Sequence, residues 1–84
     1  MNYLINPQVI FRKIEGEYYI LEPSTNMFIN FNEVGNIIFD MITQGKSQHE
    51  IVDTLLQLYD TDETTLKSDL EEFIEELKKL HILT

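Results

Sequence analysis

The sequence contains no cysteine and no tryptophan, and only three glycines and two prolines among its 84 residues. Without cysteine the chain can form neither disulfide bonds nor thiolate metal sites, and it has no thiol nucleophile. The scarcity of glycine and proline, together with 43% hydrophobic residues, excludes collagen-like and disordered chains. A chain of this length forms one small domain, residues 1–84, of which we expect residues 1–8 to form a flexible arm.

Positive charge is also scarce, because six basic residues face fifteen acidic ones and give a formal net charge of −9. This charge repels phosphate groups, so neither nucleic acid nor an anionic membrane is expected as a partner. No segment approaches the roughly 20 apolar residues that span a bilayer. The N-terminus has neither the basic start nor the long apolar stretch of a signal peptide. We therefore expect a cytoplasmic protein.

The hydrophobic pattern changes once along the chain. Residues 9–14, 18–22 and 27–31 are short runs rich in β-branched and aromatic residues. Gly16 lies in the first interval between these runs, and the turn-forming segment Pro23–Asn26 fills the second. Connections this short join antiparallel neighbours. The sequence therefore predicts a three-stranded antiparallel meander in the order 1-2-3.

After Phe31 the apolar residues follow the period of a helix. Asn32 is a suitable N-cap for a first helix that ends at Gly45, and Ser47–Glu50 reads as a capping box that begins a second. Asp60, Thr61 or Asp62 caps a third helix that runs to about residue 80. Strands followed by helices predict an α+β, winged-helix-like domain of order βββααα, with the helices packed on one face of the sheet.

Three short patterns resemble chemical motifs, and each has a simpler structural explanation. Gly45-Lys46-Ser47 lacks the earlier glycine of a phosphate-binding loop and follows a predicted helix instead of a strand. His49-Glu50 begins like a zinc-protease motif, but Asp53 stands at the second ligand position. The acidic residues within 69–76 have the spacing of a solvated helix face. We therefore expect a non-catalytic protein with no catalytic residue, no metal site and no cofactor.

The predicted sheet has few strands, so its edges matter. Three strands with one hydrophobic face are about the minimum for independent stability. An outer strand that the helices leave uncovered keeps unpaired N–H and C=O groups, which a protein must either protect or use. Residues 27–31 are apolar on both alternations, and one face must lie on the helices. Some of these side chains are therefore available at the edge or in a cleft beside it.

Three pieces of the sequence together carry a family resemblance. In Ile29–Phe39 an apolar strand is followed by an asparagine, a glycine three residues later and an apolar pair. Gly45 and Ser47–Ile51 form a helix break and a second helix start, and Asp69-Leu70 precedes further leucines and the apolar pair Ile82-Leu83. In this order and spacing, residues 9–83 resemble the PqqD-like family. These domains recognise the precursors of ribosomally synthesised and post-translationally modified peptides (RiPPs).

The resemblance implies how such a domain works. The leader segment of a precursor peptide is taken as an added β-strand on the third strand, in a groove between that strand and the third helix. Asp69 lies at the border of the apolar stripe of this helix, where its carboxylate could meet a leader lysine, arginine or main-chain amide. By this resemblance the docking strand is Met27, Phe28, Ile29 and Asn30, and the candidate groove wall is Leu66, Asp69, Leu70, Phe73 and Ile74.

The resemblance also implies the partners: a precursor leader peptide and an enzyme to which the chain delivers it in trans. The enzyme would be a leader peptidase of lasso-peptide pathways or a radical-SAM enzyme of PQQ or sactipeptide type. We expect the acidic helices to attract a basic patch of the enzyme, and the chain to be a monomer or a weak dimer.

Two other interpretations stay open. The chain could be a small acidic regulatory protein that binds a folded protein, or an acid-rich winged-helix DNA-binding protein. The third predicted helix carries three lysines against seven acidic residues over 62–79, which opposes binding to duplex DNA.

Overall fold

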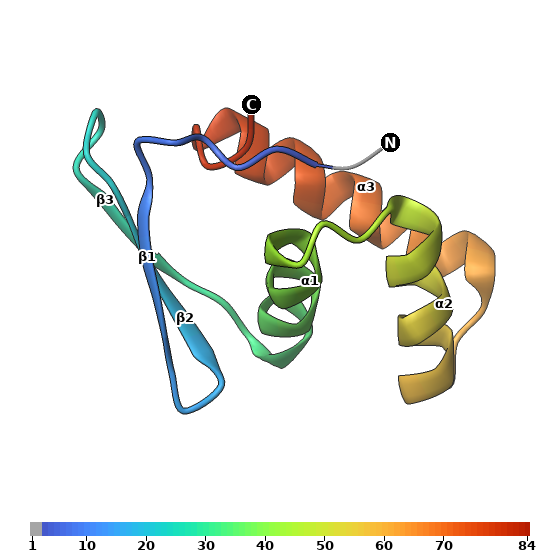
Figure 1. Ribbon diagram of the computed structural model, residues 1–84. Helices are drawn as coiled ribbons and strands as arrows, with labels where there is room; N and C mark the ends of the chain where they lie inside the picture. The colour runs from blue at the N-terminus through green and yellow to red at the C-terminus, as the bar shows by residue number, and fades with distance from the viewer. Residues whose placement is uncertain (1–2) are drawn as a thin grey trace.

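The computed structural model describes residues 3–84 and has the predicted βββααα order. All three strands are antiparallel, in the sheet order β1-β2-β3, and the helices lie on one side of the sheet (Figure 1). The α+β fold class is thereby confirmed. The elements are β1 (Ile10–Ile14), β2 (Glu17–Glu22), β3 (Met27–Asn30), α1 (Glu33–Thr43), α2 (Gln48–Leu58) and α3 (Glu63–Lys79).

The helix ends confirm the capping predictions. The Asn32 side chain accepts a hydrogen bond from the Gly35 N–H and caps α1. The Ser47–Glu50 capping box is formed in both directions and begins α2. Of the three candidates for the cap of α3, Asp62 is the one used, and its carboxylate accepts from Thr65 N–H at 2.7 Å. The phosphate-loop and zinc-motif residues are thus parts of a helix stop and a helix start.

Burial alternates along β2 and defines the two faces of the sheet. Tyr18 and Ile20 are buried against the helices, whereas Tyr19 and Leu21 point the other way and are half-buried. The aromatic part of the core is centred on Phe39 of α1, which is fully buried and packs edge-on against the ring of Tyr18 at 4.9 Å. One face of the sheet is therefore core, and the other is left to solvent.

The connection from β3 into α1 is held by two residues of α1. A Cβ added to Gly35 would lie 2.8 Å from Phe31 Cβ, so only glycine lets the helix start this close to the end of β3. The buried Asn36 side chain accepts from Tyr18 N–H at 2.9 Å and donates to Phe31 C=O at 3.4 Å. The β2–β3 pairing ends at Tyr19 and Asn30, so no strand residue accepts a bond from the Tyr18 N–H. The side-chain oxygen of Asn36 accepts this bond instead.

The N-terminal segment that the sequence predicts as an arm lies, from Tyr3 onward, beside the C-terminal end of the chain (Figure 1). Ile5 and Leu83 form an antiparallel bridge, and Asn6 N–H donates to Ile82 C=O at 2.9 Å. These bonds keep residues 4–6 on the C-terminal segment and away from β3. No helix within residues 3–84 is long and apolar enough to cross a membrane.

Candidate functional site: the open edge of β3

The outer edge of β3 carries main-chain groups that the sheet does not use. β3 pairs with β2 on one side only. Within residues 3–84, the main-chain hydrogen bonds outside the regular elements do not involve residues 27–30. The predicted free edge on the third strand is therefore present in the structure.

The register shows which groups of β3 point outward. Glu15 and Gly16 both have positive φ, 52° and 82°, and they form a two-residue turn in which Ile14 and Glu17 are a hydrogen-bonded pair. Because bonded and non-bonded pairs alternate, Ile20 and Glu22 of β2 direct their main chain toward β3. The main chain of Tyr18 points in the same direction, and its N–H donates to the Asn36 side chain.

The partners of Ile20 and Glu22 in β3 are Ile29 and Met27, whose N–H and C=O groups are thus used inside the sheet. The N–H and C=O groups of Phe28 and Asn30 point to the free edge instead. These two residues offer two donors and two acceptors to an incoming extended chain.

Successive side chains of β3 point to opposite faces of the sheet. Ile29 is opposite the fully buried Ile20 and packs on the core, and Met27 is on the same face with 38% exposure. Phe28 and Asn30 are exposed on the other face, Phe28 by 70%. A strand added at this edge would meet apolar side chains on both of its faces.

The other sheet edge, on β1, carries charged side chains. Lys13 lies on this strand, and its ammonium bonds the Asp40 carboxylate at 2.8 Å, which anchors the edge to α1. Charged residues, lysine above all, are a common means of blocking an exposed edge strand. β3 has no charged residue, because its sequence is Met-Phe-Ile-Asn. Strand addition is therefore expected on β3.

α3 is tied to the end of β3 by an aromatic contact. The ring of Phe31, which directly follows β3, lies 5.4 Å from the ring of Phe73 and 5.4 Å from that of Phe39. Phe31 and Phe73 are both half-buried and pack against the core. This pair forms an apolar floor between the strand edge and the helix.

The structure divides the predicted groove wall on α3 into two groups. Leu66, Leu70 and Ile74 are buried in the core, with 7%, 1% and 4% exposure, so in the free chain they have almost no surface for a peptide to contact. Phe73 is half-buried and Asp69 is exposed, and they are four residues apart on one side of the helix. Among the predicted residues of α3, these two have surface that a peptide can touch.

Glu22 organises the turn that leads into β3. Its buried carboxylate accepts hydrogen bonds from Ser24 Oγ at 2.6 Å and from both the N–H and the Oγ1 of Thr25 at 2.8 Å. These bonds lower the pKa of Glu22 from 4.5 to about 2, the Ser24 hydroxyl being the largest cause. All of them reach Oε2, and Oε1 has no partner within residues 3–84. This buried acid could not be predicted from the sequence, because glutamate is rarely buried.

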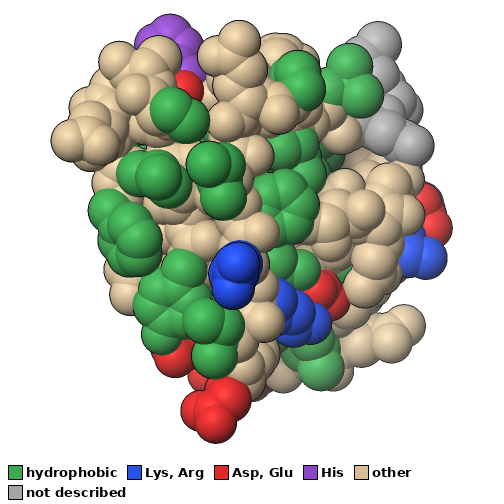
Figure 2. Space-filling view, turned by 60° about the vertical axis from the view of Figure 1, so that its left-hand side comes forward, with side chains coloured by type: hydrophobic (Ala, Val, Ile, Leu, Met, Phe, Trp, Pro, Cys, Tyr) green, Lys and Arg blue, Asp and Glu red, His purple; other side chains and the backbone are tan. Residues whose placement is uncertain are grey.

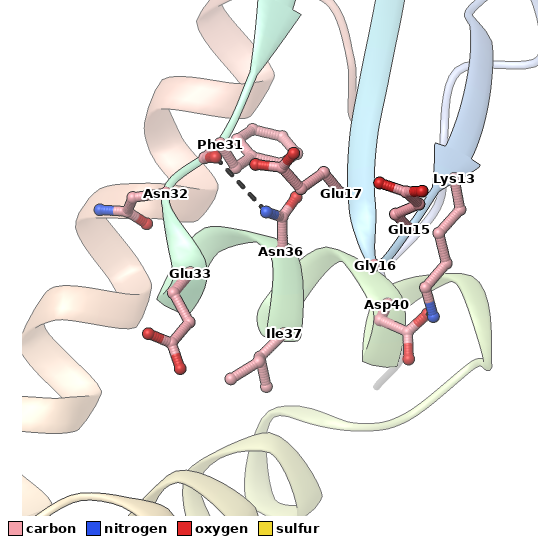
Figure 3. A pocket seen from close by; sticks show the side chains of 10 residues that line it. All are labelled: Lys13, Glu15, Gly16, Glu17, Phe31, Asn32, Glu33, Asn36, Ile37 and Asp40. Carbon is pink, nitrogen blue, oxygen red and sulfur yellow. Dashed lines mark hydrogen bonds and ion pairs between the residues drawn. The ribbon is translucent and has the colours of Figure 1, made fainter.

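Two cavities lie away from the β3 edge. One of about 440 Å³ opens between the β1–β2 turn and α1 and is lined by Phe31, Ile37 and several charged side chains (Figure 3). There Asp40 accepts from Lys13 and from Tyr18 Oη at 2.6 Å, and these bonds, that of Lys13 first, lower the pKa of Asp40. The second, of about 290 Å³, lies between Tyr3, Gln48 and α3. Residues 27–30 line neither cavity.

No group of three histidine or acidic side chains that could hold a metal ion is present within residues 3–84. His49 forms an exposed pair with Asp53 at 3.2 Å, one helical turn away, as expected of two solvated residues of α2. The open strand edge and its aromatic floor form the candidate functional site of the described residues.

Residues 17–83 match the family model described as Coenzyme PQQ synthesis protein D (PqqD). The chain belongs to the PqqD family, as the sequence pattern predicted. Its structure is similar to TbiB1 in complex with the TbiA(beta) leader peptide, with TM-score 0.90 and 29% identity over 95% of this chain and 93% of that chain. It is also similar to a lasso peptide synthetase B1 complexed with the leader peptide, with TM-score 0.90 and 14% identity over 100% and 99% of the two chains. No curated protein sequence matches this chain.

Proposed function

We propose that this chain binds the leader segment of a RiPP precursor peptide by adding it as a strand to β3. The observation that carries the proposal is the free edge, where the N–H and C=O groups of Phe28 and Asn30 point away from the sheet. A similar chain of known structure, TbiB1, is in complex with a leader peptide, which supports a peptide as the ligand.

Main-chain hydrogen bonds and side-chain burial make different contributions to peptide binding. The four edge groups of Phe28 and Asn30 form bonds that contribute about 0.5–1.5 kcal/mol each and depend little on the peptide sequence. Apolar peptide side chains that pack on Ile29, Phe31 and Phe73 contribute about 1.5–3 kcal/mol each and give selectivity. After the entropy of ordering the peptide, these terms are compatible with a micromolar to nanomolar complex, about −8 to −12 kcal/mol.

Asp69 gives the groove its charge. Its exposed carboxylate lies one helical turn before Phe73, and Glu76 lies three residues after Phe73 on the same side of α3. A basic leader side chain, or a main-chain amide at the end of the added strand, fits this position. The bound peptide is then passed to a modifying or leader-cleaving enzyme of lasso-peptide, PQQ-like or sactipeptide-like biosynthesis.

A proline at position 28 tests the edge directly. Phe28→Pro removes an N–H that points out of the sheet and leaves the β2–β3 bonds in place, and proline is tolerated on edge strands of this kind. The matched control is Phe28→Ala, which loses the same ring and keeps the N–H. Titration with a synthetic leader, taken from the precursor encoded beside this chain, should show an affinity at least about tenfold weaker for Phe28→Pro than for Phe28→Ala. Equal affinities in two folded variants would contradict strand addition at this residue.

A further inference from the structure

The buried carboxylate of Glu22 has one oxygen without a hydrogen-bond partner. Ser24 and Thr25 donate to Oε2, whereas no donor within residues 3–84 reaches Oε1, although Glu22 is only 1% exposed. Glu22 also forms no ion pair with the described residues. Buried polar atoms are nearly always hydrogen-bonded, and a buried charge without a countercharge is costly. Oε1 is therefore available to a donor from a ligand or to a water molecule.

The register places Glu22 one strand away from the free edge. Glu22 is opposite Met27 of β3, and like Ile20 it points to the helix side of the sheet. Met27 therefore separates Glu22 from the edge on this side. Its side chain is 38% exposed and flexible, so it can move aside for a group of the ligand.

Little other negative charge lies on the sheet beside β3. Of the β2 residues that pair with β3, only Glu22 is charged, and β3 itself has no charged residue. Figure 2, in which the sheet side of the molecule comes forward, shows hydrophobic side chains gathered on this surface and few acidic ones. A cationic residue of a strand bound to β3 would therefore find its carboxylate partner in Glu22, on the far side of Met27.

A strand added to β3 would bring a side chain within reach of Glu22. Two residues of this strand, two positions apart, would point to the helix side, one beside Ile29 and one beside Met27. This holds for both strand directions. The Cα of the residue beside Met27 would lie about 10 Å from that of Glu22, which is two strand spacings. A glutamate and a lysine or arginine side chain together span this distance, whereas a glutamate and a serine do not.

Glu22 is well prepared to accept a cation. The bonds from Ser24 and Thr25, that of the Ser24 hydroxyl first, hold the carboxylate in place and lower its pKa to about 2, so it is ionised at neutral pH. Oε1 is already buried in the free chain, so a new bond requires no further dehydration of this acceptor. Bonds from an ammonium or guanidinium group to a carboxylate are about twice as strong as neutral ones. These properties favour a leader with a positive charge at this position.

We propose that Glu22 is a specificity-determining residue, whose Oε1 accepts a hydrogen bond from a leader lysine or arginine that lies beside Met27. The leader then carries this basic residue two positions from the residue that packs on Ile29. The inference rests on the proposed function, since it requires a leader strand on β3. The contact is distinct from that proposed for Asp69, which is an exposed residue of α3.

A double-mutant cycle between Glu22 and the leader tests the proposal. The probes are the synthetic leader of the precursor encoded beside this chain and copies in which each lysine or arginine is replaced, one at a time, by norleucine. Glu22→Gln keeps an oxygen that can accept from Ser24 and Thr25, and its NH₂ group takes the place of Oε1. We expect one leader position at which norleucine weakens binding to the wild-type chain about tenfold and binding to Glu22→Gln less than about twofold.

Thr25→Val is the matched control for the turn, because it removes a bond to Oε2 and leaves Oε1 in place. This variant should keep the wild-type preference for the basic residue. A crystal structure of the leader complex should show the leader cation on Oε1, and it requires no variant of Glu22 to fold.

Four results would overturn the proposal: a leader that binds but has no basic residue, no leader position whose effect depends on Glu22, equal loss of the preference in Thr25→Val, and a water molecule instead of the cation on Oε1 in the complex. The third would make Glu22 a residue that only holds the turn. A wild-type chain that does not bind the leader contradicts the proposed function instead, so the two failures are distinguishable.

Discussion

Phe31 and Phe73 place their rings 5.4 Å apart at an angle of 63°, which joins the end of β3 to the middle of α3. The two residues are 42 positions apart in the sequence, and neither is fully buried. Gly35 leaves room for the Phe31 side chain, since a Cβ at this position would collide with it. The pair thus links the strand edge to the helix that we propose as the second wall of the peptide groove.

Truncation of Phe73 should damage both stability and binding. Phe73→Ala removes the ring from Phe31 and from the proposed groove floor, so we expect a free energy of unfolding lower by about 2 kcal/mol and a leader affinity at least about tenfold weaker. Phe73→Leu retains much of the volume and should recover most of the stability. Urea unfolding and peptide titration on both variants measure the two effects. A Phe73→Ala variant that is destabilised yet binds the leader as wild type does would remove Phe73 from the groove.

Neutralisation of Asp69 should weaken leader binding in a salt-dependent way. Asp69→Asn keeps the shape of the side chain and removes its charge, so we expect an affinity several-fold weaker at low ionic strength and a smaller difference at high salt. Glu75→Gln is the control, since Glu75 lines the cavity on the other flank of α3. Isothermal titration at two salt concentrations measures the effect. Identical salt profiles for wild type and Asp69→Asn would make Asp69 an ordinary solvent-exposed residue.

Glu22 should make stability depend on acid pH. Its pKa is lowered from 4.5 to about 2 in the folded chain, so its contribution is fully present above about pH 4.5 and is lost as the pH falls toward 2. Other acids with lowered pKa, such as Asp40 and Asp62, add to the wild-type slope. Urea unfolding between pH 6 and about pH 2.5 should therefore show a shallower loss of stability for Glu22→Gln than for wild type. Parallel curves would mean that the Ser24 and Thr25 bonds do not stabilise the ionised carboxylate.

The sequence predicted most of the architecture, because its signals are local. The caps at Asn32 and Ser47 and the switch from strand to helix periodicity depend on residues a few positions apart. The prediction that some side chains of residues 27–31 stay exposed follows from the same pattern, and Phe28 confirms it.

The parts that the sequence did not predict depend on pairing at a distance. The Glu15-Gly16 turn and the strand register decide which N–H groups of β3 point to the free edge. If the register shifted by one residue, the N–H of Ile29 would point outward instead of that of Phe28. In the sequence Asn36 resembles any polar helix residue, because its role as acceptor for the Tyr18 N–H depends on a residue 18 positions away. Ile74 and Phe73 are adjacent in the sequence, and packing alone decides that the first is buried and the second half-buried.

Amide hydrogen exchange of β3, measured residue by residue with and without the leader peptide, is the most direct test of strand addition. In the free chain the amides of Phe28 and Asn30 should exchange fast and that of Ile29 slowly, because only the last is bonded within the sheet. Saturating leader should slow exchange at Phe28 and Asn30 by at least about tenfold and leave Ile29 nearly unchanged. A leader that binds with these two amides still exchanging freely, and with protection elsewhere, such as around the cavity beside α1, would contradict the account.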